Sequence, residues 1–298
     1  MEFPWVRVRR MTRTPALRRL VRGVRPSPDA LVPSARVGLE DPGQSGESLA
    51  EAALERGYAG IHLAPVARRR DQEGSEVWRS DAPLAQALTA ARAAAPELAL
   101  MAELDLPLFV RSGRPGLVSE GLVDAETAQE ALGKAAITLG EAGADVVGVR
   151  GQVDGGVHAV RGALDEAGLD RVAVLAYSAD LYSPFTELRP VSAEKAADLL
   201  DPLDPGAVLR QADLDVADGV DLLGVQPSLL ALDIVRELSD EHDQPIVARV
   251  TDQEERTLAA AARAGVAPLG LLAASVHGAL IRAGARLVIT PWAFEERP

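Results

Sequence analysis

The chain has 298 residues, of which 47% are hydrophobic and 3% aromatic, so it can bury one large core or two ordinary ones, built mainly from aliphatic side chains. It contains no cysteine, which excludes disulfide bonds and thiolate metal sites. A net charge of −13, with no secretory signal and no apolar run of about 18 residues, predicts a cytoplasmic protein that binds neither membranes nor nucleic acid.

The first part of the chain is strongly basic, in contrast to the acidic remainder. Residues 1–25 contain eight arginines and one acidic residue, Glu2. Apolar residues recur among these arginines, at Val8, Leu17, Leu20 and Val21. Because charge and apolar surface occur together, and because the acidic remainder would repel phosphate, we predict that residues 1–30 form an arm that docks on the acidic body of a neighbouring subunit.

From residue 31 onward, short β-branched runs alternate with alanine-rich segments of helical periodicity. The predicted strands are 31–37, 60–65, 98–104, 145–149, 172–177, 220–225, 245–250 and 286–290. The predicted helices include 47–56, 82–95, 125–142 and 157–166. Eight such units predict one (β/α)8 TIM-barrel domain over residues 31–298. A doubly wound sheet is the structural alternative, but the chain has no early Gly-x-Gly-x-x-Gly turn to favour it.

Several short motifs follow one another in a characteristic order. They include TPALRRLVR at 14–22, GEAGADVV at 140–147, YSA at 177–179 and VQP at 225–227. Their order and spacing resemble the porphobilinogen synthase (5-aminolaevulinate dehydratase) family over nearly the whole chain. The resemblance implies a barrel with its active site at the carboxyl ends of the strands. It also implies an arm that wraps a neighbouring barrel, so that the chain would form a homo-oligomer.

The resemblance also implies two Schiff-base lysines at consecutive strand ends, and neither is present. The first position is Asp180 and the second is Gln226. Neither a carboxylate nor an amide can form an imine with a ketone substrate. Other functional positions of the family fall on residues of this chain as follows: the aspartate after the fourth strand on Gly151, the tyrosine of the last strand on Pro291, and the Tyr-Ser pair on Tyr177 and Ser178.

A metal or cofactor is not expected. The three cysteines of the family's zinc loop fall on Asp105, Pro107 and Pro115, and proline cannot ligate a metal. The chain has two lysines, Lys134 and Lys195, and we predict that both lie away from the barrel mouth.

Charged residues are frequent at the predicted strand ends. The candidate ligand-binding residues are Arg150, Asp180, Gln226, Arg249 and Asp252. One interpretation is a rebuilt pocket for a small anionic or zwitterionic molecule, with Arg150 and Arg249 as an anion clamp. The favoured interpretation is a mouth filled by mutual salt bridges, with Asp180 opposite Arg150 or Arg249.

Two functional hypotheses follow from the sequence. The first is a pseudoenzyme that acts as a scaffold or regulator, or binds a metabolite, in tetrapyrrole metabolism, with an active paralogue as a candidate partner. The second is a barrel enzyme that performs acid–base chemistry on a different small anionic substrate, with Asp180, Glu103 or Asp252 as the acting carboxylate. The second hypothesis requires at least one carboxylate at the mouth that has no arginine partner.

Overall fold

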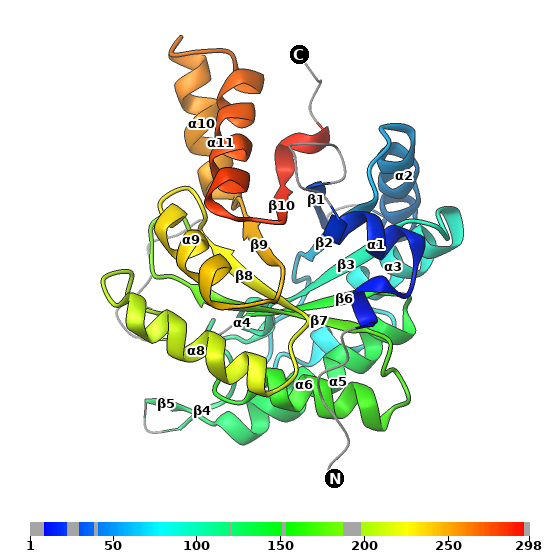
Figure 1. The fold of residues 1–298 in the computed structure, drawn as a ribbon. Coiled ribbons are helices and arrows are strands. Elements are labelled where there is room, and N and C mark those ends of the chain that lie inside the picture. The colour runs from blue at the N-terminus through cyan, green and yellow to red at the C-terminus, as the bar shows by residue number, and fades with distance from the viewer. Residues whose placement is uncertain are drawn as a thin grey trace.

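Eight parallel strands close into a barrel, which confirms the predicted (β/α)8 fold (Figure 1). The computed structural model describes residues 9–22, 30–38, 41–119, 121–150, 153–186 and 198–294. Around the barrel the strands are β1 (Leu31–Val37), β2 (Gly60–Pro65), β3 (Ala99–Leu104), β6 (Val146–Arg150), β7 (Ala173–Asp180), β8 (Leu222–Gln226), β9 (Ile246–Arg249) and β10 (Leu287–Thr290). A small antiparallel hairpin of β4 (Val118–Ser119) and β5 (Leu122–Val123) lies outside it.

Helices surround the barrel and connect successive strands. The longer ones are α2 (Pro42–Glu55), α3 (Pro83–Ala94), α5 (Ala125–Glu141), α6 (Gly156–Glu166), α8 (Pro205–Ala217), α9 (Leu232–Glu241), α10 (Asp252–Arg263) and α11 (Leu269–Ala283). Short helical turns are η1 (Arg10–Thr12), η3 (Ser75–Trp78), α4 (Leu106–Phe109) and η4 (Pro291–Phe294). None of the helices within the described ranges combines the length and the apolar character that crossing a membrane requires.

Two predicted elements differ from the observed ones for identifiable reasons. Helix α2 begins at Pro42, ahead of the predicted start at residue 47. Gly43 and Gly46 weaken the helical pattern there, but Gly46 lets α2 approach α3, since a Cβ at this position would lie 2.2 Å from the Ala87 carbonyl oxygen. Strand β7 continues past residue 177 to Asp180, because it carries a β-bulge that the sequence pattern does not reveal.

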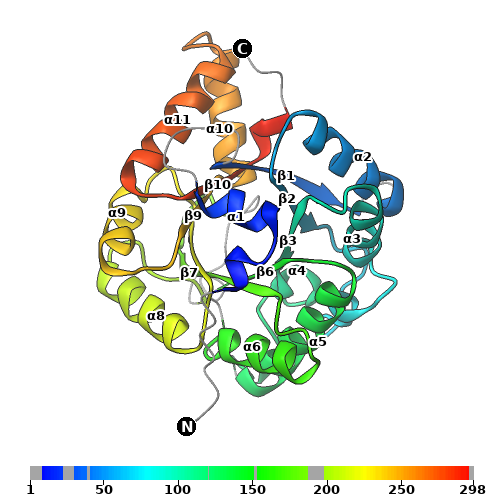
Figure 2. The same ribbon diagram turned by 45° about the vertical axis from the view of Figure 1, so that its right-hand side comes forward.

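The interior of the barrel is apolar toward the amino-terminal ends of its strands. The side chains there include Val32, Met101, Val146, Leu175, Leu222, Val247 and Leu287. Helix α1 (Pro15–Arg22) lies over the centre of the ring of strands (Figure 2). Its Leu17 and Leu20 are fully buried in the same cluster, so the described part of the arm closes this end of the barrel.

Basic residues of the arm contact acidic residues at the base of the barrel. The Nε of Arg10 donates to the Asp170 carbonyl oxygen at 3.1 Å, and its Nη1 lies 3.4 Å from the Asp221 carboxylate. Arg13 lies 2.9 Å from the carboxylate of Asp145. In a single chain the arm therefore docks on its own acidic barrel, whereas docking on a neighbouring subunit remains a prediction.

Candidate functional site

A buried polar cluster lies inside the barrel at the carboxyl ends of its strands. Side chains of a strand alternate between the two faces of a sheet, so the inward positions of β3, β6, β8 and β9 continue from the apolar interior to these ends. The final inward residues of these strands and of β7, together with the adjacent Asp105, form what we call the mouth network: Glu103, Asp105, Arg150, Asp180, Gln226 and Arg249. Apart from Asp105, at the rim, its members are each at most 8% exposed.

The bulge in β7 determines which residues of the YSA motif reach this network. Ala176 pairs with Leu223 and Ala179 with Val225, so β7 has one more residue than β8 between these pairs. This extra residue allows both Tyr177 and Asp180 to face the interior, although they are three positions apart.

Asp180 is held by two neighbours. Its carboxylate accepts hydrogen bonds from Nε and Nη2 of Arg150 at 2.9 and 3.0 Å, a bidentate geometry. It also accepts a hydrogen bond from the Gln226 side-chain amide at 2.9 Å. The two residues that stand at the expected lysine positions therefore bind each other.

Arg249 occupies the other side of the network. Its guanidinium donates to the Glu103 carboxylate and to Oε1 of Gln226, the latter at 2.8 Å. It lies over the ring of Tyr177, with 5.7 Å between the guanidinium carbon and the ring centroid. Burial by itself would lower the pKa of Arg249, but the charge and hydrogen bond of Glu103, together with Tyr177, raise this pKa above its ordinary value. The guanidinium is thus permanently charged and already paired.

The arrangement is a closed set of ion pairs. Arg150 also lies 3.4 Å from the carboxylate of Asp105, so the network contains three carboxylates and two guanidiniums. Both arginines of the expected anion clamp are engaged, and the excess of negative charge disfavours an added anion. We therefore favour the salt-bridged arrangement over the clamp.

The remaining candidate residues lie apart from the network. Asp252, at the first position of α10, pairs with Arg36 of β1. Pro291 begins η4 directly after β10 and brings no hydroxyl group to the mouth. Gly151 and Lys195 lie outside the described residues. Lys134 is exposed on α5, where it contacts Glu130 and not the network, in agreement with the expectation for this lysine.

Two buried polar atoms lie near the network, one on Tyr177 of the Tyr-Ser pair and one on His62, which the sequence did not mark as a site residue. The Tyr177 hydroxyl and Nε2 of His62 have no hydrogen-bond partner among the described residues. His62 is joined to Ser34 through Nδ1 at 2.9 Å, and Nε2 lies 4.0 Å from Glu103. The alternation of Gly60, His62 and Ala64 along β2 was the available signal that His62 faces inward.

Ser178 faces away from the barrel interior, toward α8. Its hydroxyl donates to the carboxylate of Asp215 at 2.6 Å, and the Gln211 amide donates to the same carboxylate at 2.9 Å. Burial raises the pKa of Asp215 to about 6, although these two hydrogen bonds partly oppose the rise. Ser178 is thus a packing contact between β7 and α8.

Asp215→Asn should make stability less dependent on pH. Folding raises the pKa of Asp215, so its side chain contributes fully to the stability of the folded protein below pH 3.8, the ordinary pKa of Asp. This contribution is lost as the pH rises through about 6. Between pH 4 and pH 7.5 the wild type should therefore lose about 2–3 kcal/mol of stability that the variant does not lose, from 1.36 kcal/mol per pKa unit. Urea unfolding from pH 4 to pH 7.5 measures this difference, and a difference that does not change with pH would contradict the assignment.

The residues at the position of the family's zinc loop do not fit a zinc ion. Of the three, only Asp105 has a ligating side chain, and it lies beside Arg150. In the ranges that the structure describes, no three His, Cys, Asp or Glu side chains are grouped so that they could hold a metal ion.

Comparisons with known proteins agree on one family. A sequence model described as delta-aminolevulinic acid dehydratase matches residues 5–296. The delta-aminolevulinic acid dehydratase of Streptomyces coelicolor is 31% identical over 318 aligned residues, which cover 98% of this chain and 96% of that protein. The Escherichia coli K12 protein of the same name is 30% identical over 251 residues, covering 82% of this chain and 78% of its own length.

A solved structure extends this similarity to the fold. The crystal structure of delta-aminolevulinic acid dehydratase (porphobilinogen synthase) from Toxoplasma gondii ME49, in complex with the reaction product porphobilinogen, superposes with a TM-score of 0.84 at 27% identity. The superposition covers 97% of this chain and 90% of that one. Sequence and fold are therefore similar over nearly the whole length.

Proposed function

Because this chain belongs to the delta-aminolevulinic acid dehydratase family, we propose that it is a porphobilinogen synthase-like pseudoenzyme, which keeps the barrel of the family but does not condense 5-aminolaevulinate. In the family chemistry, lysine amines hold the substrate molecules as imines, and neighbouring groups move protons. Groups of this kind act as a unit, so the loss of both lysines should lower the rate by more than about 10⁴-fold.

One observation carries the proposal. The two residues at the lysine positions, Asp180 and Gln226, are hydrogen-bonded to each other, and Arg150 and Arg249 hold them from either side. A buried carboxylate with a bidentate guanidinium is neither a nucleophile for a ketone nor a free proton acceptor. The substitutions therefore form a consistent, charge-paired arrangement in place of the nucleophiles.

A non-catalytic barrel of this family has two roles that suit its surfaces. It can act as a scaffolding or regulatory subunit in the cytoplasm, assembling with copies of itself or with an active paralogue through the arginine-rich arm. It can also bind a metabolite of tetrapyrrole metabolism. Co-purification with a second family member would support the first role, and ligand binding without turnover would support the second.

The alternative, acid–base catalysis on another substrate, has weaker support. It needs a carboxylate at the mouth without an arginine partner, yet each of the three carboxylates considered for it has one. Asp180 pairs with Arg150, Glu103 with Arg249, and Asp252 with Arg36.

Borohydride trapping with 5-aminolaevulinate should leave the intact mass of the protein unchanged, and no porphobilinogen should form. The reason is that neither Asp180 nor Gln226 can form the imine that borohydride reduces. The measurement is intact-protein mass spectrometry together with an assay for porphobilinogen, with the Streptomyces coelicolor relative as the positive control.

Two further variants distinguish an adduct at the barrel mouth from an adduct at a surface amine. Lys134→Arg and Lys195→Arg remove the two lysines one at a time. Formation of porphobilinogen, or a stoichiometric adduct that disappears in Lys195→Arg, would show that another lysine reaches the mouth and would overturn the proposal.

A further inference from the structure

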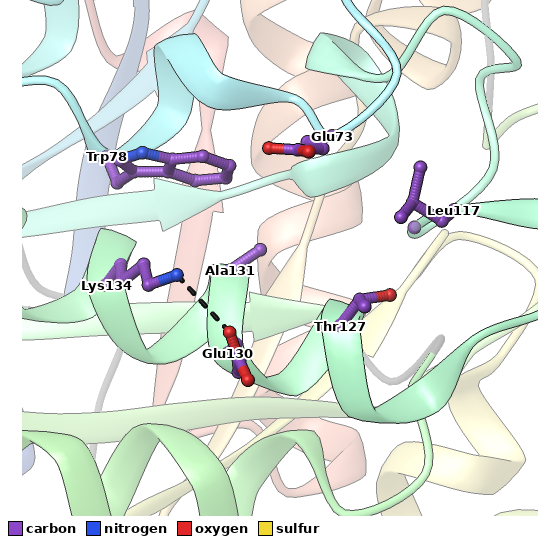
Figure 3. A pocket seen from close by; sticks show the side chains of 8 residues that line it. Glu73, Trp78, Leu117, Thr127, Glu130, Ala131 and Lys134 are labelled. Atoms are coloured by element: carbon purple, nitrogen blue, oxygen red, sulfur yellow. Dashed lines mark hydrogen bonds and ion pairs between the residues drawn. The ribbon is translucent and has the colours of Figure 1, made fainter.

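A pocket lies on the outside of the barrel, apart from the mouth network (Figure 3). It is bounded by η3 with the loop before it, by the loop at residues 116–117, and by one face of α5. Its volume is about 240 Å³, enough for a molecule of the size of an amino acid. The residues that line it are Glu73, Trp78, Gly116, Leu117, Thr127, Glu130, Ala131 and Lys134.

The lower wall of the pocket, as drawn in Figure 3, is one face of helix α5. Thr127, Ala131 and Lys134 are spaced by four and three residues, so they lie on one face of the helix. The first turn is fixed by Asp124, whose carboxylate accepts a hydrogen bond from the Thr127 amide at 3.1 Å. The small side chain of Ala131 forms the floor, between the hydroxyl of Thr127 and the ammonium of Lys134 (Figure 3).

The upper wall, formed by η3 and the loop before it, is held in place by hydrogen bonds. The Asp71 carboxylate accepts from the backbone amides of Glu73, Gly74 and Ser75 at 3.0, 2.6 and 3.0 Å, which fixes the loop that carries Glu73. The Trp78 carbonyl oxygen accepts from the Thr138 hydroxyl at 2.9 Å, which ties η3 to α5. The two walls are therefore joined before any ligand arrives, and a preformed site loses less entropy on binding.

The charges of the pocket are arranged around the indole ring. The ammonium of Lys134 lies 5.8 Å from the centroid of the Trp78 ring and 3.4 Å from the Glu130 carboxylate. Glu73 is on the opposite wall, beside the indole (Figure 3). Among the described residues the Glu73 carboxylate has no ionic partner. The pocket thus presents the Lys134–Glu130 ion pair, the carboxylate of Glu73 without an ionic partner among the described residues, and the aromatic face of Trp78.

We propose that this pocket binds a small zwitterion of the amino-acid type, with its carboxylate toward Lys134, its ammonium toward Glu73, and its carbon chain against Trp78 and over Ala131. A monoanion could contact Lys134 but would leave Glu73 without a partner, and a monocation could pair with Glu73 but would make no use of Lys134, whereas a zwitterion can pair with both side chains. Because the pocket uses no residue of the mouth network, the proposal stands independently of whether the barrel is catalytic.

Isothermal titration with 5-aminopentanoate tests the site, with pentanoate and pentylamine as analogues that carry one charge each. We expect the zwitterion to bind at least about fivefold more tightly than either analogue, since each analogue lacks one partly exposed ion pair. Glu73→Gln and Lys134→Gln should each weaken the binding of the zwitterion by a similar factor. Both side chains are exposed, so these variants should fold normally.

A matched control and a second readout make the result specific. Arg236→Gln breaks an exposed ion pair of the same i, i+4 spacing on α9 and should leave binding unchanged. The ligand should also alter tryptophan fluorescence, and Trp78→Phe should abolish that change while Trp5 and Trp292 remain. Binding that is equal in all variants, equal for the three probes, or absent up to about 10 mM would overturn the proposal.

Discussion

Arg150→Met should lower the free energy of unfolding by about 3–5 kcal/mol, because it leaves the carboxylate of Asp180 buried without its cation. Asp180 is 1% exposed and takes two of its three hydrogen bonds from Arg150, so the remaining contact with Gln226 cannot compensate the charge. The measurement is urea-induced unfolding followed by circular dichroism, in which the midpoint should fall while the slope stays constant.

Two companion variants separate the ion pair from a general loss of packing. Arg236→Met on α9 removes an exposed ion pair with Asp240 and should leave the unfolding midpoint almost unchanged. The double variant Arg150→Met/Asp180→Leu removes both charges and should recover part of the loss, although the Gln226 amide then loses an acceptor. If Arg150→Met were as mild as Arg236→Met, the mouth network would not be the buried ion-pair cluster described above.

Leu20→Ala should lower the free energy of unfolding by about 2–5 kcal/mol, the range for removing a large aliphatic side chain from a packed core. Leu20 is fully buried against the interior of the barrel although it belongs to the basic arm. Urea unfolding measures the loss. Leu203→Ala is the control, since Leu203 is 89% exposed and its truncation should have almost no effect.

Sedimentation of the same variant tests where the arm docks. If the arm of one subunit closes the barrel of its neighbour, Leu20→Ala should shift the protein toward smaller oligomers as well as lower its free energy of unfolding. A loss of stability with no change of mass would place the contact within one chain. An unchanged unfolding midpoint would contradict the burial of Leu20 itself.

The mouth network has a composition that is consistent with the proposed loss of the family's two lysines. The two lysines expected at the ends of β7 and β8 are absent. The strands on either side, β6 and β9, end in Arg150 and Arg249, and each of these arginines pairs with a carboxylate. The substitutions at 180 and 226 are thus compatible with each other. A change at one of these positions alone would leave a partner unsatisfied.

The barrel could be predicted from the amino-acid sequence, and so could the assignment of Asp180 and Gln226 to the two lysine positions of the family, which stays a prediction. Strand and helix periodicities are local properties, so most predicted strands agree with the observed ones to within a few residues. The replacement of the two lysines by Asp180 and Gln226 is a matter of covalent identity, which no fold can change. Of the candidate residues named from the sequence, Arg150, Asp180, Gln226 and Arg249 lie together at the barrel mouth, whereas Asp252 pairs with Arg36.

The tertiary structure alone decided which charges pair and which side chains face inward. Arg249 and Glu103 are 146 residues apart, and their contact exists only because the closed barrel turns the ends of β9 and β3, which are not neighbouring strands, toward the same interior. The inward position of Asp180 depends on a bulge that arises from pairing with β8, and the early start of α2 depends on contact with α3. The outer pocket at Trp78 likewise joins two separate segments. Each of these features is a relation between residues distant along the chain, which local periodicity does not encode.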